Sequence, residues 1–267
     1  MSLGESTHRG GASSADADEC VSRLHRDGYA LVRGVLSSAD IEALREAVDR
    51  VFEEPRFQRN RYHEFIAVRL FETAEIFEEL LTREPLISLV ESVLGDDCHI
   101  IAQNVLRNTS AHRLADFHVD DLLIFPSGDE MPRHDPRMQI PVHVLGVQIP
   151  LTDLESIEYG PSQYVPGSHA SGKRPNDPLE PEFEGRGPDT VLCRAGDIYL
   201  HNGQCWHRGL PNRSDRTRYL FQQTYARRWV SQRFHPFVNY QIPRHVLERA
   251  DARRRRVLGL HPMGDYG

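Results

Sequence analysis

The second half of the chain is divided into short segments of β-branched and other apolar residues. Clusters of Gly, Pro, Asn and Asp separate these segments, which is the pattern of an antiparallel sandwich or barrel. The sequence therefore predicts a mainly β fold, and this feature restricts the possible architectures more than any other. The predicted strands are 100–106, 142–151, 190–194, 198–200 and 219–225.

Helices are predicted on both sides of this β-rich region. Residues 41–52 place apolar side chains on one helical face, and Ser37 with Asp40 has the spacing of a capping box. A second helical region, 74–94, contains Pro85, which should interrupt it. Further elements are expected as a helix at 19–27, a strand at 29–32 and a C-terminal helix at 244–258.

Length and composition favour one large domain. The chain has 267 residues, of which 39% are hydrophobic and 27% are charged, so it has enough apolar side chains for a core and a well-solvated surface. We expect residues 1–18 to form a flexible N-terminal tail. Residues 19–267 should form a single domain with N-terminal helices and a C-terminal helix.

Charge and cysteine usage exclude several classes of protein. The formal net charge of -7 argues against a nucleic-acid-binding protein, and the basic run 253–256 is interpreted as a solvated helix face. No apolar run is long enough to span a bilayer, and the N-terminus lacks a signal-peptide core. Four separated cysteines without a C-x-x-C pair indicate reduced thiols. We therefore expect a cytoplasmic protein that binds neither nucleic acid nor membranes, with an oligomeric state that the sequence leaves open.

The first chemical motif is the H-x-D triplet of His118 and Asp120. Side chains at i and i+2 of a strand point to the same face, so this triplet can direct an imidazole and a carboxylate at one metal ion. Two ligands do not make a site, and the triplet alone is common by chance.

A third ligand is available at His207, which would complete a 2-His-1-carboxylate triad that leaves open positions on iron(II). Residues 209–215 are rich in turn formers and predict a tight loop or hairpin. His207 and Arg218 would then lie on neighbouring antiparallel strands and face one cavity. The guanidinium of Arg218 offers a planar fork for a carboxylate. His201, six residues before His207, is expected to be structural or to lie beside the ligands.

Together these segments resemble the phytanoyl-CoA dioxygenase family of iron(II)- and 2-oxoglutarate-dependent oxygenases. His207, Asn212 and Arg218 match the family motif H-x(4)-N-x(5)-R. The resemblance extends in matching order over about residues 24–261. The other similar segments are the D-G-Y opening at 27–37, L-T-D at 151–153, G-P at 160–161, V-P-G-S-H at 165–169, A-G-D at 195–197 and the closing segment 258–262.

The resemblance implies a double-stranded β-helix, a cupin-like jelly roll, with flanking helices. It implies iron(II) at His118, Asp120 and His207. It also implies that Arg218 binds the distal carboxylate of 2-oxoglutarate.

Three further contacts to the cosubstrate are predicted. Gln103 and Arg107 match family positions on the strand before H-x-D, and their i+4 spacing places them on one face. Ser214 is expected to supply a hydrogen bond, because Gly209 occupies a position where the family often has a small hydroxyl residue. Tyr159 is a second departure, since the family often has Asn there.

The implied reaction uses O2 and releases succinate and CO2. Hydroxylation is the expected outcome, while desaturation, ring closure and alcohol oxidation remain open. Related halogenases carry Gly or Ala at the position of Asp120, so the carboxylate favours oxygenation.

Residues 126–141 are too long and too rich in proline for a simple hairpin, so they form either an active-site lid or a surface loop. Their polar character favours a small, polar substrate, such as an antibiotic or another specialised metabolite. Asp121, His134 and Gln148 are the predicted substrate contacts. The alternatives are a non-catalytic ligand-binding jelly roll and a metal-dependent hydrolase or isomerase on the same scaffold.

Overall fold

The computed structural model describes residues 14–54, 66–109, 115–120, 122–233 and 240–263. The helices are α1 (Ser14–Asp27), α2 (Ser38–Glu53), α4 (Glu75–Leu80), α5 (Leu86–Leu94), α6 (Arg244–Arg249) and α7 (Ala252–Val257), with short 3-10 turns η1 (Leu70–Glu72), η2 (Ile157–Tyr159) and η3 (Ser168–Ala170). The strands are β1 (Tyr29–Val32), β2 (Ile66–Val68), β3 (His99–Asn108), β4 (Val144–Pro150), β5 (Ser162–Tyr164), β6 (Asp189–Thr190), β7 (Ile198–Asn202), β8 (His207–Gly209) and β9 (Arg218–Ala226).

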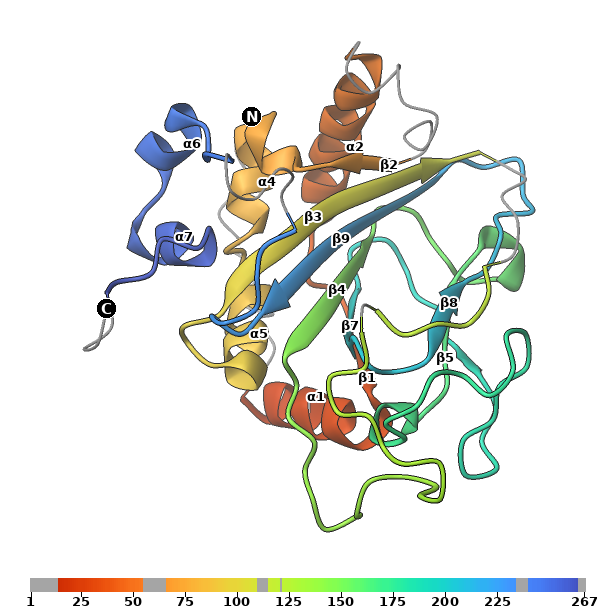
Figure 1. Ribbon diagram of the computed structural model, residues 1–267. Coiled ribbons are helices and arrows are strands. Elements are labelled where there is room, and N and C mark those ends of the chain that lie inside the picture. The colour runs from red at the N-terminus through yellow and green to blue at the C-terminus, as the bar shows by residue number, and fades with distance from the viewer. Residues whose placement is uncertain (1–13, 55–65, 110–114, 121, 234–239, 264–267) are drawn as a thin grey trace.

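Within the described ranges the strands form two antiparallel sheets. The larger has the order β1-β7-β4-β9-β3-β2 and the smaller has the order β6-β5-β8. Figure 1 shows α2, α4 and α5 on one side of the larger sheet, with β5 and β8 on the other side. This arrangement of helices around a β-rich centre confirms the predicted mainly β jelly roll.

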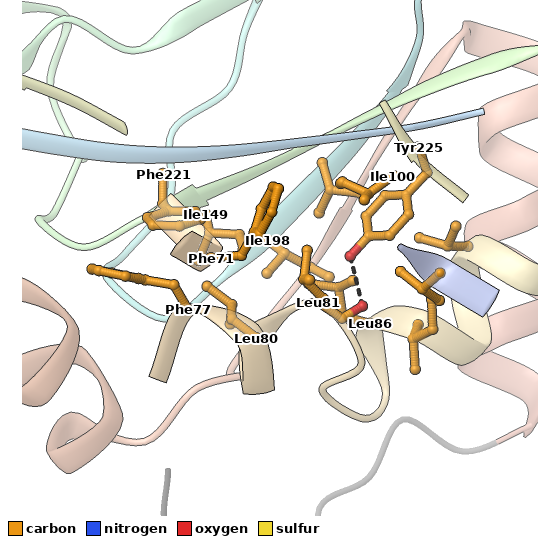
Figure 2. Packing of buried hydrophobic residues seen from close by; sticks show 14 of the residues in the cluster. Phe71, Phe77, Leu80, Leu81, Leu86, Ile100, Ile149, Ile198, Phe221 and Tyr225 are labelled. Carbon is orange, nitrogen blue, oxygen red and sulfur yellow. Dashed lines mark hydrogen bonds between the residues drawn. The ribbon is translucent and has the colours of Figure 1, made fainter. Parts of the chain in front are cut away.

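The main core lies between the larger sheet and its helices. Phe77 of α4 stacks on Phe221 of β9 with ring centroids 5.5 Å apart, and both side chains are fully buried. Figure 2 shows this packing and the hydrogen bond that the Tyr225 hydroxyl donates to the carbonyl of Leu81, 2.8 Å away. A second, smaller hydrophobic cluster lies between the two sheets, and it includes Tyr164, Tyr199, Cys205 and Leu220.

Local sequence signals account for several element boundaries. Ser37 and Asp40 form the predicted capping box at the start of α2. The helical region 74–94 is broken into α4 and α5 around Pro85, as predicted. Gly196, in the predicted A-G-D turn, has a φ of 88°. Its carbonyl accepts hydrogen bonds from the backbone amides of Val35 and Leu36.

Two boundary predictions need correction. Helix α1 begins at Ser14, inside the stretch 1–18 that was expected to be a tail; residues 1–13 lie outside the described ranges. The single helix expected at 244–258 is two helices, because the chain is extended at Ala250 and Asp251 caps α7.

The basic run 253–256 is not simply a solvated face. Arg253 pairs with Glu84 and Glu91, and Arg256 pairs with Glu91. These ion pairs attach α7 to α5. Among the described residues, no helix is long and apolar enough to cross a membrane.

The Phe77–Phe221 pair provides a test of this core. Phe77→Ala should lower the free energy of unfolding by about 3–5 kcal/mol, the usual cost of truncating a buried Phe. Urea denaturation monitored by circular dichroism measures it. The control Leu179→Ala alters a side chain that is 48% exposed and should cost less than about 0.5 kcal/mol. Equal costs for the two variants would contradict this description of the core.

Candidate metal and cosubstrate site

Two backbone hydrogen bonds join the H-x-D segment to strand β8. The amide of His118 donates to the carbonyl of His207 at 3.0 Å, and the amide of His207 donates to the carbonyl of His118 at 2.9 Å. Directly opposed residues of an antiparallel pair have neighbouring side chains. The centroids of the two imidazole rings therefore lie 4.4 Å apart, although His118 and His207 are 89 positions apart in the sequence.

His118, Asp120 and His207 form a group that could hold a metal ion. One ligand atom from each residue lies within 4.8 Å of the other two. The Nδ1 of His118 lies 3.0 Å from the carbonyl of Asp116, and the Nδ1 of His207 lies 2.8 Å from the carbonyl of Cys205. A carbonyl can only accept, so each Nδ1 carries the proton and each Nε2 keeps its lone pair for a metal. This donor set fits iron(II).

The charge states suit metal binding. Burial lowers the pKa of His207 to about 4, so this imidazole is neutral at pH 7. Burial by itself would raise the pKa of Asp120. The neighbouring His207 and the hydrogen bond from His201 outweigh burial and hold that pKa well below its usual range. The site therefore presents a neutral nitrogen donor at His207 and an anionic oxygen donor at Asp120.

The backbone around Asp120 is fixed by the turn that precedes β8. The amide of Asp120 donates to the carbonyl of Gly203 at 2.8 Å. The side-chain amide of Gln204 donates to the carbonyl of Leu122 at 3.1 Å and accepts from the amide of Ile124 at 3.0 Å. Sequence reasoning missed Gln204, because a glutamine in a turn carries no motif of its own.

The V-P-G-S-H segment supports the strand of His207. The amide of Val165 donates to the carbonyl of Trp206 at 2.9 Å, and the amide of Trp206 donates to the hydroxyl of Ser168 at 2.8 Å. His169, with 7% of its surface exposed, lies with Nε2 3.1 Å from the carbonyl of His25 in α1. The segment thus connects β8 to the N-terminal helix.

Arg218 lies at the start of β9, and only 7% of its surface is exposed. Its Nε donates to Oδ1 of Asn108 at 3.0 Å, and its Nη1 donates to the carbonyls of Leu210, at 3.1 Å, and Gly160. Burial lowers its pKa, but an arginine stays protonated at neutral pH. These acceptors occupy Nε and Nη1, and Nη2 forms no hydrogen bond with the residues that the structure describes.

Three carboxamide side chains lie between the Arg218 end of β9 and the metal-ligand group. Gln222 of β9 is opposite Asn104 of β3 and Gln148 of β4, and its Nε2 donates to Oε1 of Gln148 at 3.0 Å. Opposed residues share a face, and Arg218 and Gln222 are four residues apart on the same face. Asn104 and Gln222 were not predicted. Their period-2 spacing from Asn108 and Arg218 was the available signal.

The prediction that Gln103 and Arg107 contact the cosubstrate is corrected, because their side chains lie on the face of β3 opposite to that of Asn104. Gln103 is fully buried against the helical layer: its Oε1 accepts from the amide of Phe71 at 2.7 Å and its Nε2 donates to the carbonyl of Phe77 at 2.9 Å. Arg107 pairs with Asp49 of α2 at 2.8 Å. The predicted i+4 spacing is right, but a shift of one residue along a strand changes the face.

The loop between β8 and β9 also differs from the prediction. The two strands belong to opposite sheets, so His207 and Arg218 do not lie on paired strands. Ser214 donates to Oδ1 of Asn212 at 2.7 Å, and its hydroxyl accepts from the amide of Arg216. These contacts lie within the loop, and the structure does not bring Ser214 to the row formed by Asn104, Gln222 and Gln148.

The predicted substrate residues have different positions. Gln148 faces the space between the sheets as part of the carboxamide row. His134 donates from Nε2 to the carbonyl of Phe125 at 2.9 Å, which is a contact within the loop region. Asp121 lies outside the described residues.

The segment 126–141 is attached to the chain around η3. The amide of Ser127 donates to the carbonyl of Gly172 at 3.1 Å, the amide of His134 donates to the carbonyl of Ala170 at 2.9 Å, and Arg133 pairs with Glu184. The segment has no helix or strand of its own.

A family model described as phytanoyl-CoA dioxygenase (PhyH) matches residues 24–220. The chain belongs to the phytanoyl-CoA dioxygenase family. Two uncharacterised relatives in this comparison come from Mycobacterium bovis and Mycobacterium tuberculosis. Each is 24% identical over 253 residues, which cover 92% of this chain and 88% of the relative.

Solved structures share the fold at low sequence identity. HygX from Streptomyces hygroscopicus, with nickel and 2-oxoglutarate bound, superimposes with a TM-score of 0.63 at 21% identity, over 80% of this chain and 88% of its own. The 2-oxoglutarate-dependent epimerase SnoN from nogalamycin biosynthesis gives 0.61 at 22% identity, over 80% and 84%. The carbocyclase SnoK from the same pathway gives 0.59 at 20% identity, over 78% and 83%.

The stability of this member of the phytanoyl-CoA dioxygenase family should depend on pH through His169. Burial lowers its pKa from 6.5 to about 4, so below pH 6.5 the unfolded chain takes up a proton before the folded protein does. The stabilisation is complete above pH 6.5 and is lost as the pH falls toward 4. Over this window the wild type should lose roughly 3 kcal/mol more than His169→Gln, which cannot titrate. Urea unfolding at pH 7.5 and 4.5 tests this. Parallel losses in both proteins would contradict it.

Proposed function

We propose that this protein is an iron(II)- and 2-oxoglutarate-dependent dioxygenase that oxidises, most simply by hydroxylation, a C–H bond of a small polar metabolite in specialised or antibiotic metabolism. The observation that carries the proposal is the convergence of His118, Asp120 and His207, each with a free donor atom, on one point. Succinate and CO2 are the expected co-products.

Iron(II), when bound, supplies the chemistry of O2 activation, and the chain supplies three ligands that leave other coordination positions open. His118 and His207 offer Nε2 because their Nδ1 protons are held by backbone carbonyls. Asp120 offers a carboxylate that stays charged at neutral pH. His207 and Asp120 need no change of protonation at neutral pH to bind the metal.

The interior between the ligands and Arg218 is proposed to hold 2-oxoglutarate. Arg218 is a buried cation with three protein acceptors, and a carboxylate would complete its set of hydrogen bonds. The row of Asn104, Gln222 and Gln148 offers neutral donors and acceptors along the same face. An alternative non-catalytic binding role would require none of the metal ligands.

The segment 126–141 is proposed to contact the substrate and to limit the access of water. It follows the H-x-D triplet in the chain and carries Arg133, His134 and Arg137 among its polar side chains. Asp121, His134 and Gln148 remain the proposed substrate contacts. HygX, crystallised with hygromycin B, and SnoN, crystallised with a nogalamycin derivative, support a polyfunctional natural product as the substrate class.

The reaction outcome is open to direct measurement. SnoN is described as an epimerase and SnoK as a carbocyclase, so the same scaffold serves reactions other than hydroxylation. Mass spectrometry of products distinguishes them: hydroxylation adds 16 mass units by the insertion of one oxygen, epimerisation adds none and ring closure removes two hydrogens.

The metal assignment predicts that His118→Ala, Asp120→Ala and His207→Ala each abolish substrate-stimulated succinate formation, because a three-ligand site has no spare donor. Iron titration should show lost binding, and circular dichroism should show an intact fold. His245→Ala, which changes a surface histidine that contacts the carbonyl of Glu72, is the control. Normal succinate formation by Asp120→Ala would rule out this site.

The cosubstrate assignment predicts that Arg218→Lys weakens the binding of 2-oxoglutarate. A lysine lacks the Nη2 group that the contacts to Asn108, Leu210 and Gly160 leave for a carboxylate. The loss of a hydrogen bond to a charged group costs about 1.5–3 kcal/mol, or roughly ten- to hundredfold in Kd. Calorimetric titration of the nickel-loaded protein measures it. The matched control is Arg216→Lys, since Arg216 lies over the ring of Tyr159. A larger effect in the control would place the carboxylate elsewhere.

A further inference from the structure

Asp120 has two carboxylate oxygens with different surroundings. Oδ1 lies 3.7 Å from Nε2 of His207, on the side of the metal ligands. Oδ2 lies 3.2 Å from Nε2 of His201, which is not one of the ligands. The two oxygens are therefore not equivalent before any metal binds.

His201 is held in place by a second buried side chain. Its Nδ1 lies 3.2 Å from the hydroxyl of Tyr164, and both residues are only 1% exposed. If His201 donates from Nε2 to the carboxylate, its Nδ1 must accept, and the Tyr164 hydroxyl is the donor that it needs. The chain Tyr164–His201–Asp120 is thus complete, with each proton assigned to one acceptor.

Tyr164 also contacts the ligand His207. Its ring stacks on the His207 ring with centroids 5.6 Å apart and an interplanar angle of 22°, and the two residues are opposed across β5 and β8. His201 comes from β7 of the larger sheet, where it is opposed to Gly146 of β4. Tyr164 therefore connects a ligand in the smaller sheet to a side chain of the larger sheet.

Gly146 provides the space for the imidazole of His201. A Cβ added at Gly146 would lie 2.1 Å from Cε1 and 2.5 Å from Nε2 of His201. No other residue type leaves room there without displacing the ring. The three atoms nearest to such a Cβ all belong to the His201 ring, so a substitution at Gly146 alters the position of His201 without removing a functional group.

We propose that His201 and Tyr164 are positioning residues that engage Oδ2 of Asp120, so that Oδ1 alone is offered to the metal. A carboxylate held by one oxygen occupies one coordination position. Without this restraint both oxygens are available, and the carboxylate competes with 2-oxoglutarate. This inference rests on the proposed function and adds a requirement to it.

The test separates metal binding from cosubstrate binding. Nickel(II) and then 2-oxoglutarate are titrated calorimetrically into the wild type and into His201→Leu, His201→Gln, Tyr164→Phe and Gly146→Ala. At saturating nickel, His201→Leu and Gly146→Ala should bind 2-oxoglutarate about tenfold more weakly, the lower end of the usual effect of a residue behind a metal ligand. Tyr164→Phe should show a smaller loss. His201→Gln, which restores an N–H donor, should bind within about threefold of the wild type, a margin well inside that tenfold effect.

The control is His99→Leu, which removes another buried histidine from the same sheet, one that contacts His261 and Val230. It should lower stability without changing the affinity for 2-oxoglutarate. The anaerobic absorbance band of the iron(II)–2-oxoglutarate complex gives a second readout, and it should shift in His201→Leu and Gly146→Ala but not in His99→Leu.

The outcomes are distinguishable. Wild-type affinity and an unshifted band in both His201→Leu and Gly146→Ala would overturn the positioning role while the proposed function stands. If His201→Leu does not fold, Gly146→Ala with His201 intact gives the same decision. Failure of the wild type itself to bind 2-oxoglutarate after loading with nickel would overturn the proposed function, and this inference with it.

Discussion

The two hydrogen bonds between the backbones of His118 and His207 are the constraint on which the rest of the site depends. They join residues that are far apart in the sequence, so they form only when the segment around His118 packs against β8. A single pair of this kind contributes little by itself, and the flanking side chains of Phe117, Val119 and Trp206 are buried. V-P-G-S-H on one side and Gly203 with Gln204 on the other fix the two segments that the bridge joins. Metal binding is therefore a property of the completed fold.

The sequence was sufficient to predict the architecture and the convergence of His118, Asp120 and His207, because the signals for both are local. The β-rich pattern, the capping box of α2 and the break at Pro85 are local signals that the structure confirms. The H-x-D spacing and the H-x(4)-N-x(5)-R motif are also local signals. Local sequence does not reveal that β8 is short or that it belongs to the smaller sheet. The predicted pairing of the strands of His207 and Arg218 was therefore wrong.

Gln103 shows why the cosubstrate residues were harder to predict. Strand β3 is covered on both faces, so alternation does not reveal which face lines the interior. A buried glutamine on such a strand suggests a binding site, yet this one satisfies backbone groups of Phe71 and Phe77 in the helical layer. The interior face is identified only by the register with β9, which places Asn104 opposite Gln222. The basic run 253–256 has a similar explanation, since its partners on α5 are far away in sequence.

The two faces of strand β9 have different surroundings, which matters for any redesign of this protein. Phe221 and Tyr225 pack into the helical core, whereas Arg218 and Gln222 face the interior between the sheets. Both sets of side chains share one backbone, so a substitution that repacks the core on this strand also bears on the face proposed for 2-oxoglutarate. The segment 126–141 is different, because it contains no metal ligand and is held mainly by contacts to residues around η3. If this segment contacts the substrate as proposed, libraries for new substrate preferences can be placed there without altering either sheet.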